Sequence, residues 1–153
     1  MSSRVAVLNG GRMVQCDEPE RLYKRPRTRF VADFFRGCNV LEVAPIGEAN
    51  GAPAYRLAGA LIEAAPADGM AHGRTHIAVR SEDLHIGAQA EERSFRLPGH
   101  LVESVYRGTV LEYLVELGDG QRVIATTTRR LPEAPGSAVC VGFNPEAVVP
   151  LED

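Results

Sequence analysis

Short strand-like segments separated by turns constrain this chain most, because that pattern is typical of a small β-barrel or sandwich. The clearest segments are His100 to Tyr106 and Thr109 to Leu117. Asp119-Gly120 then predicts a tight hairpin turn, since both residue types tolerate the positive φ that such turns require. Arg122 to Thr127 follows as the next strand. We therefore expect residues 39–153 to be all-β.

Other segments of this region continue the pattern. Further strands are predicted at Val40 to Val43, Tyr55 to Ala58, Ala60 to Glu63, His76 to Arg80, Ala138 to Phe143 and Ala147 to Pro150. The turn-forming or polar stretches between strands are predicted to be loops, and they cover residues 45–53, 65–74, 88–95 and 132–135. Residues 88–95 are expected to be a mobile loop.

The first 38 residues have a different character. Val5 to Leu8 and Arg12 to Gln15 are β-prone and flank Asn9-Gly10-Gly11, which predicts a hairpin. The apolar residues of this hairpin need a cover, because exposed apolar strands invite pairing at their edges. We expect this hairpin to pair with a second copy of the chain or to be poorly ordered.

Two short helices are predicted after the hairpin. Pro19 suits the first position of a helix, where a missing N–H has no consequence, and Pro26 ends that helix. Thr28 is the expected cap of the second helix and Gly37 its expected C′ residue. The second helix carries one predicted apolar stripe, formed by Phe30, Val31, Phe34 and Phe35.

Three linked motifs occupy this N-terminal region. They are Arg4-Val-Ala-Val-Leu-Asn9 with Gly11-Arg12, Pro19-x-x-Leu22-Tyr23-x-x-Pro26, and Arg29-Phe-Val-Ala-Asp-Phe-Phe-Arg-Gly37 with Asn39. Their order and spacing resemble the end of the ATP-binding subunit of ABC importers, in the branch that includes polyamine, iron and sugar uptake. Asp17-Glu18 stands where that family usually has Gly-Thr before the first proline.

The later chain resembles the accessory domain of the same family, which is called TOBE. The matching stretches are Val79-Arg-Ser-Glu-Asp-Leu84, Tyr106-Arg-Gly-Thr-Val-Leu-Glu-Tyr-Leu-Val115 and Phe143-Asn-Pro-Glu-Ala147. Ser81 and Ala147 depart from the usual Pro and Asp. The resemblance implies two parts, namely residues 1–38 from the end of an ATPase domain and residues 39–153 as a small barrel resembling the oligonucleotide/oligosaccharide-binding (OB) fold.

The motifs that bind and hydrolyse ATP do not occur in this sequence. A phosphate-binding loop needs a glycine-rich turn before Lys-Ser or Lys-Thr, whereas Lys24 is followed by Arg25 and Pro26. No Leu-Ser-Gly-Gly-Gln loop is present. We expect this chain to be no enzyme and to hold no cofactor, while the resemblance implies that the full-length subunit binds ATP and Mg.

Composition bears on the cellular location of the protein and on the state of its cysteines. No run of 18 apolar residues is present and no signal peptide precedes the first strand, which favours a cytoplasmic protein. Its three cysteines, Cys16, Cys38 and Cys140, are odd in number and far apart, which predicts reduced thiols. The resemblance places the intact subunit at the inner face of the cell membrane.

Nucleic-acid and metal sites are both disfavoured. The net charge is −3, and the cations Arg21, Lys24, Arg25, Arg27, Arg29 and Arg36 alternate with acidic residues. This mixture predicts a solvated helix face and no nucleic-acid partner. His72 and His76 have the i, i+4 spacing of helical metal ligands, but they lie in a glycine-containing stretch without cysteines, so no zinc site is expected.

Five residues are the candidate ligand or interface residues. Arg80, Glu82 and Asp83 form the most motif-like polar cluster, which could contact a neighbouring domain or a small ligand. The alternative reading is a structural turn in which Arg80 pairs with a carboxylate and an acidic residue caps the next segment. Thr127 and Arg129 belong to a Thr/Arg run that could bind an anion. Glu112 and Tyr113 are expected on opposite faces of a strand, with the tyrosine in the core.

The leading functional hypothesis is a regulatory and dimerisation domain of an ABC importer ATP-binding subunit, with a polyamine as the first choice of solute. Its expected partners are a second copy of the chain, the permease subunits and a small-molecule regulator. The alternative is a free-standing barrel that binds a small oxyanion through the stretch Thr126 to Arg130. The N-terminal hairpin and helices argue against that alternative, because a ligand-binding barrel does not need them.

Overall fold

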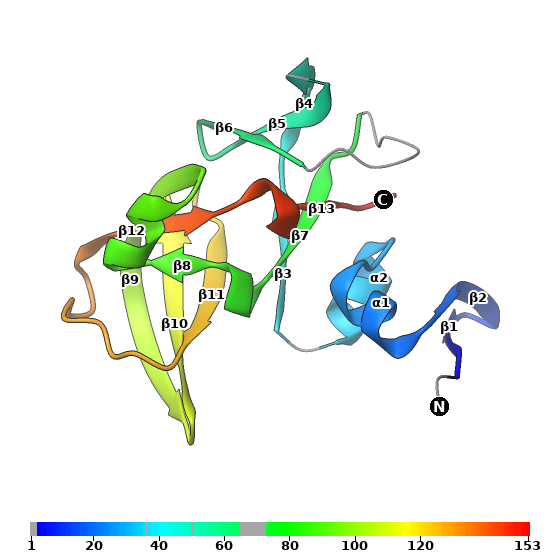
Figure 1. The fold of residues 1–153 in the computed structure, drawn as a ribbon, viewed down its shortest axis with the longest axis horizontal. Coiled ribbons are helices and arrows are strands. Elements are labelled where there is room, and N and C mark those ends of the chain that lie inside the picture. The colour runs from blue at the N-terminus through cyan, green and yellow to red at the C-terminus, as the bar shows by residue number, and fades with distance from the viewer. Residues whose placement is uncertain (1–2, 36, 50, 65–72) are drawn as a thin grey trace.

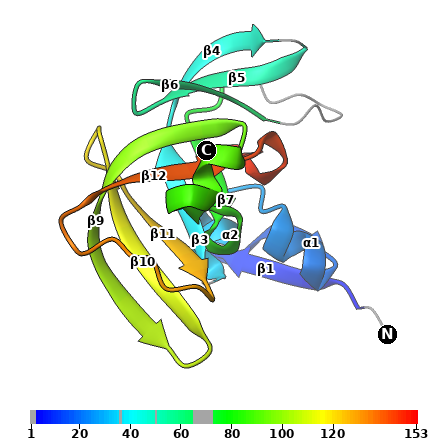
Figure 2. The ribbon, with the colours of Figure 1, turned by 60° about the vertical axis from the view of Figure 1, so that its left-hand side comes forward.

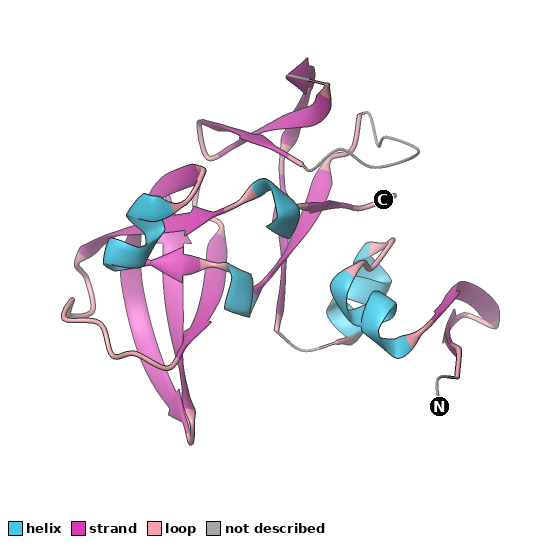
Figure 3. Ribbon diagram, viewed as in Figure 1, coloured by secondary structure: helices cyan, strands magenta, loops and turns pink. Residues whose placement is uncertain are grey.

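A computed structural model describes residues 3–35, 37–49, 51–64 and 73–153. Within these ranges the chain is mainly β, with an OB-like barrel preceded by a β-hairpin and two short helices (Figures 1 and 3). Arg36, His72 and most of the predicted loop 65–74 lie outside the described residues. No helix among the described residues is long and apolar enough to cross a membrane.

The elements follow the predicted order. The hairpin consists of β1 (Val5–Asn9) and β2 (Arg12–Asp17), and the helices are α1 (Pro19–Lys24) and α2 (Arg29–Phe34). The remaining strands are β3 (Cys38–Glu42), β4 (Ala44–Ala49), β5 (Ala52–Leu57), β6 (Ala60–Glu63), β7 (His76–Arg80), β8 (His85–Ile86), β9 (Phe95–Arg107), β10 (Val110–Leu117), β11 (Arg122–Thr127), β12 (Ala138–Phe143) and β13 (Val149–Pro150). Three 3₁₀ helices lie between strands: η1 (Ser81–Asp83), η2 (Gly87–Glu92) and η3 (Pro145–Ala147).

Three antiparallel sheets surround one core. The largest has the order β11-β10-β9-β12-β8 and curls strongly, as Figure 2 shows; the others are β13-β7-β3 and β4-β5-β6. Along β10 the buried residues alternate with partly exposed ones, which is the pattern of a strand with one face in the core. Side chains from all three sheets meet in the same apolar cluster, including Leu41, Tyr55, Ile77, Tyr113 and Phe143.

Amide side chains connect the sheets where no strand ladder does. The Asn39 amide accepts from Ile124 N at 2.8 Å and donates to the carbonyl oxygens of Ile124 at 2.9 Å and Val79 at 3.2 Å. Gln121 accepts from Glu42 N at 2.7 Å and donates to Glu42 O at 2.9 Å. These side chains therefore join β3 to β11, which are not paired as strands. They supply hydrogen-bond partners for backbone N–H and C=O groups that would otherwise be unpaired.

The hairpin and helices form a small unit beside the barrel. Gly10 and Gly11 have φ of +61° and +80°, as the predicted turn requires. Val7 is buried against Leu22 and Val31. The chain's own helices thus cover Val7, whereas Leu8 and Met13 are 61% and 63% exposed. Pairing of the hairpin with a second copy of the chain stays a prediction.

The second helix departs from its predicted stripe. Thr28 caps it as predicted, because its Oγ1 accepts from Val31 N at 3.3 Å. Val31 and Ala32 are buried, whereas Phe34 is 62% exposed, so the single apolar stripe is wrong. The helix ends at Phe34 with Phe35 as its C-cap, and Gly37 is therefore not the C′ residue.

Three predicted segments of the barrel are corrected. Residues 45–53 are not only turns, because β4 pairs with β5 through a bulge near Gly47. Residues 88–95 are not simply a loop: η2 covers most of them, and Ala90 is fully buried against β12. The strand predicted from His100 begins at Phe95, since Pro98 already pairs with Cys140.

A cavity between β8 and β11 as candidate functional site

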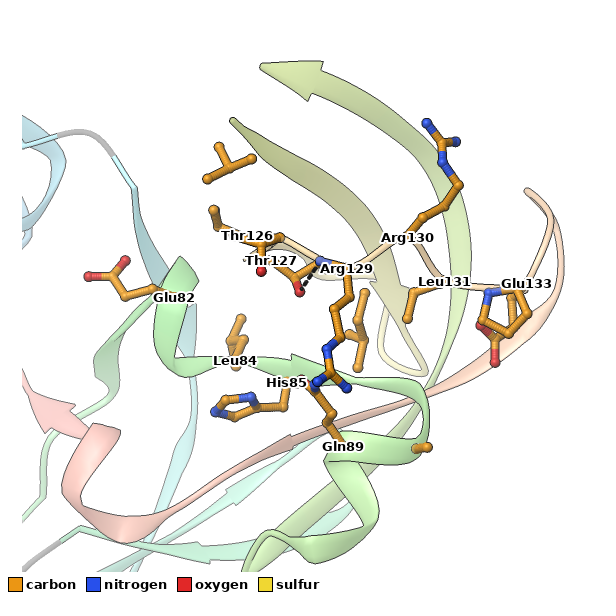
Figure 4. A pocket seen from close by; sticks show the side chains of 15 residues that line it. Glu82, Leu84, His85, Gln89, Thr126, Thr127, Arg129, Arg130, Leu131 and Glu133 are labelled. Atoms are coloured by element: carbon orange, nitrogen blue, oxygen red, sulfur yellow. Dashed lines mark hydrogen bonds between the residues drawn. The ribbon is translucent and has the colours of Figure 1, made fainter. Parts of the chain in front are cut away.

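A cavity of about 570 Å³ lies beside the β8 and β11 edges of the curled sheet (Figure 4). That volume lies within the range of small-molecule sites. One side is formed by η1, β8 and η2, and the other by the end of β11 with residues 128–133. Its lining is Glu82, Leu84, His85, Ile86, Ala88, Gln89, Val110, Thr126, Thr127, Thr128, Arg129, Arg130, Leu131, Pro132 and Glu133.

One hydrogen bond and the close approach of Gly87 fix the position of residues 128–133 beside the cavity. Leu131 N donates to the hydroxyl of the buried core residue Tyr113 at 2.8 Å. Gly87 lies against the same segment at φ +73°, and a side chain there would approach Leu131 to 3.4 Å. The predicted core position of Tyr113 is confirmed, and its hydroxyl positions one wall of the site.

The two neighbouring arginines of the lining differ in direction. In Figure 4 the side chain of Arg129 extends across the cavity towards β8 and η2, whereas that of Arg130 points away. The backbone turns at this point because Arg129 N donates to Thr127 Oγ1 at 3.1 Å. One residue of the Thr/Arg run is therefore aimed at the cavity.

The five candidate residues separate into two groups. Thr127 and Arg129 line the cavity together with Glu82. Asp83 lines a smaller hollow of about 240 Å³ with His85, Arg93, Asn144, Glu146 and Ala147. Arg80 lines neither of these two hollows and is 5% exposed.

Arg80 and Glu82 connect the barrel to helix α1. The Arg80 guanidinium lies 3.0 Å from the centre of the Tyr23 ring, donates to Tyr23 O, and donates to Glu82 Oε1 at 3.2 Å. Tyr23 Oη donates to the same carboxylate oxygen at 3.0 Å. Ser81 continues the chain of contacts, accepting from Thr126 Oγ1 at 2.9 Å and donating to Glu82 Oε2 at 3.4 Å. Glu82 is thus shared between the α1 junction and the cavity lining.

Burial and neighbouring charges shift two titratable groups here. Burial raises the pKa of Asp83, and the nearby Glu82 carboxylate adds to that increase. Burial lowers the pKa of His85, as does Arg93, whose Nη2 lies 3.5 Å from His85 Nδ1. A neutral His85 can accept a hydrogen bond from Arg93, so it adds no positive charge to the cavity.

The sequence pattern did not point to the apolar wall of the cavity or to Glu133. Leu84 and Ile86 lie just before and within β8, Leu131 lies in a loop distant in sequence, and only the fold brings the three together. Glu133 lies in the predicted loop 132–135, and its Oε2 is buried without a hydrogen-bond partner among the described residues. The position of the Glu133 carboxylate between Pro132 and Pro135 was the sequence feature that could have drawn attention to it.

The remaining candidate clusters show little that suggests a site. Within the described ranges, no group of three or more His, Cys, Asp or Glu residues is placed to hold a metal ion. Cys16, Cys38 and Cys140 are all free, and burial raises the pKa of Cys38 to about 11, which makes its thiol unreactive. Four of the N-terminal cations form ion pairs: Arg21 with Asp17, Lys24 with Glu20, Arg27 with Glu152 and Arg29 with Asp153.

Comparison with known proteins gives similarity over the whole chain. Residues 77–151 match the TOBE domain family. The chain is 36% identical over 159 residues to the spermidine/putrescine import ATP-binding protein PotA 1 of Pseudomonas aeruginosa, covering 100% of this chain and 42% of that protein. It is 34% identical over 160 residues to the PotA protein of Ruegeria pomeroyi, with the same coverage. The chain thus spans about two fifths of the length of these relatives.

The fold is shared with solved structures. One of them is the cytoplasmic molybdate-binding protein ModG with molybdate bound, with a TM-score of 0.55 and 14% sequence identity, over 76% of this chain and 96% of that one. At that identity the likeness concerns the fold alone.

Proposed function

Because the chain corresponds to the C-terminal part of ABC importer ATP-binding subunits and contains their TOBE domain, we propose that it is the regulatory and dimerisation domain of such a subunit. In this role it carries out no chemistry and holds no cofactor. ATP and Mg would bind the portion of the subunit that this chain does not span. The relatives' names make spermidine or putrescine the proposed solute.

The packed junction between α1 and the barrel is the observation that carries this proposal. A regulatory domain must transmit force or position to the ATPase domain, and a loose linker would not do so. Here Tyr23 on α1 is held by Arg80 and Glu82, and the opposite end of the unit is held by Glu152 N, which donates to Arg27 O at 2.7 Å. Two separate attachments support rigid coupling of the two parts.

The proposed partners follow from this role. A second copy of the chain would form the homodimer, the permease subunits would bind the ATPase portion, and a small molecule would act as regulator. The complex would lie in the cytoplasm against the inner face of the membrane, without nucleic acid. A regulator changes transport only if it binds one conformation better than another.

The solution mass of the chain, measured by light scattering, tests the dimerisation role. We expect a dimer whose mass does not depend on added ligand. A monomer at every accessible concentration would refute the dimerisation role. The same samples with spermidine, molybdate, sulfate or phosphate test for a regulator, which is expected to change thermal stability without changing the mass.

A second candidate is a free-standing barrel that binds an oxyanion. The observation that favours it is the convergence of Thr127 and Arg129 on the cavity. A monomer stabilised by molybdate or sulfate alone would support this candidate over the assembly role.

A further inference from the structure

We propose that the cavity between β8 and β11 binds a small organic acid, with its carboxylate on Arg129 and its apolar body against Leu84, Ile86 and Leu131. This inference goes beyond the assembly role, because the cavity can bind an acid whether or not the chain dimerises. The two proposals therefore fail independently.

The walls of the cavity select an apolar ligand body. Leu84 and Ile86 are 2% and 4% exposed, so they form the rigid base of the cavity, and its more accessible apolar surface comes from Val110, Leu131 and Pro132. Leu131 is held opposite by the Tyr113 hydroxyl. Small-molecule sites are commonly apolar with a few placed polar groups, and this volume accommodates an aromatic ring with a short chain.

The free charges of the cavity select an anionic head group. Four charged side chains line it. Glu82 is engaged by Tyr23 and Arg80, Arg130 points away (Figure 4), and Glu133 has one carboxylate oxygen buried, which leaves Arg129 as the accessible charge. No hydrogen bond or ion pair among the described residues involves the guanidinium of Arg129. A guanidinium over an apolar wall matches a carboxylate, which it can bind through two parallel hydrogen bonds.

Glu133, on the other side of Leu131, favours a ligand that also carries a hydrogen-bond donor. Its buried Oε2 has no hydrogen-bond partner among the described residues, and an unpaired buried acceptor is unfavourable. A ligand with a hydroxyl group distant from its carboxylate would supply the missing donor once the Glu133 side chain turns towards the cavity. An inorganic oxyanion would leave the apolar wall uncovered, and a polyamine would be repelled by Arg129.

Matched probes test the ligand class on the 153-residue chain. Phenylpropionate, phenylpropanol and phenylpropylamine share one body and differ in charge, and para-hydroxyphenylpropionate adds the distant donor. Calorimetry gives the affinities, and backbone amide shifts locate the site. We expect the acid to bind at least about tenfold more tightly than the amine, with shifts at residues 126–133. The hydroxylated acid should bind most tightly.

Neighbouring arginines provide the control. Arg129→Gln should weaken phenylpropionate binding about tenfold or more while leaving phenylpropanol unchanged. Arg130→Gln removes the same charge one residue later and should change the affinity less than about twofold, since the Arg130 side chain is exposed and points away from the cavity. Thermal unfolding of both variants checks that the fold is kept.

Several results would overturn the proposal. Equal binding of acid and amine, equal effects of the two arginine substitutions, or the absence of shifts at residues 126–133 would each do so. Sulfate binding as tightly as phenylpropionate would replace the organic acid by an inorganic oxyanion. Equal affinity for the two acids would remove the role assigned to Glu133.

Discussion

At the scale of single residues, Glu82 is the side chain on which most contacts converge. One of its oxygens accepts from both Tyr23 and Arg80, and the other accepts from Ser81. Arg80 is almost fully buried, so its charge depends on these partners. Within the cluster Arg80-Ser-Glu-Asp83, Arg80 and Glu82 therefore join the barrel to α1, and Glu82 also lines the cavity.

Substitution of Tyr23 by Phe tests the junction with little disturbance. The ring stays beneath Arg80, but the hydrogen bond to Glu82 is lost, which we expect to lower the free energy of unfolding by about 0.5–1.5 kcal/mol. Urea unfolding measures this change. Tyr106→Phe is the control, because Tyr106 is 69% exposed and should show almost no effect. Equal losses in the two variants would contradict the role of Tyr23.

Asp83 gives a pH-dependent prediction. Because its pKa is raised by burial and by Glu82, its stabilising contribution is complete below the ordinary pKa of 3.8 and is lost as pH rises through the raised value. Asp83→Asn should therefore stabilise the chain at neutral pH, by a few tenths of a kcal/mol since the group is only partly buried. The gain should shrink as pH falls towards about 4.

Urea unfolding of the Asp83→Asn variant at several pH values measures this trend. Glu103→Gln removes one negative charge from an exposed position and serves as the control. A gain that is the same at every pH, or the same in both variants, would argue that net charge and not the environment of Asp83 is responsible.

At the scale of elements, Asn39 replaces a missing ladder between β3 and β11. Asn39→Ala would leave both backbone groups of Ile124 without their partner, and we expect a loss of about 1–3 kcal/mol in unfolding free energy. Gln121→Ala removes the exposed hydrogen bonds between Gln121 and Glu42, which also join β11 to β3, and should lower the unfolding free energy by a smaller amount. Denaturant unfolding of the two variants ranks these contributions. A smaller loss for Asn39 than for Gln121 would contradict this account.

The packing of η2 on β12 depends on one glycine. A Cβ at Gly142 would lie 2.5 Å from Ala90 O, which is too close for any ordinary contact. Gly142→Ala should displace η2 and lower the unfolding free energy by about 1–3 kcal/mol, as overpacking does. Gly118→Ala is the control, because nothing lies within 4 Å of the added carbon there. A thermal unfolding temperature unchanged by Gly142→Ala would show that η2 adapts easily.

Sequence patterns predicted the elements whose signal is local. The Asn9-Gly10-Gly11 turn, the Thr28 cap and the alternation along β10 each depend on neighbouring residues, and each is confirmed. The strand β4 was missed because its Pro- and Gly-containing sequence forms a strand only through pairing with β5. Likewise, Ala90 becomes a core residue only because Gly142 of β12 makes room for it.

The candidate site was predictable only in part for the same reason. The run Thr127 to Arg130 was recognisable as polar and cationic, yet nothing local distinguishes Arg129, which extends over the cavity, from Arg130, which does not. The apolar wall joins Leu84 and Ile86, just before and within β8, with Leu131, more than forty positions later. Such a wall depends on long-range strand pairing, which periodicity does not reveal.

At the scale of the whole molecule, the hairpin presents one covered and one exposed side. Val7 is buried against the helices, whereas Leu8 and Met13 face each other across the strands and remain more than half exposed. Unpaired strand edges and exposed apolar side chains together favour association with another surface. We therefore expect this outer side of the hairpin to contribute to self-association of the chain.

Introducing charge on this outer side tests where self-association occurs. The double substitution Leu8→Lys and Met13→Lys should convert a dimer of the chain to a monomer, because burying two unpaired ammonium groups in an interface is highly unfavourable. The matched control is Ile46→Lys with Leu61→Lys, which adds the same charge at residues 46% and 49% exposed on the β4-β5-β6 sheet and should leave the mass unchanged. Light scattering distinguishes the two outcomes. If only the control pair dissociates the dimer, the contact lies on the β4-β5-β6 sheet, and the apolar side of the hairpin serves another partner.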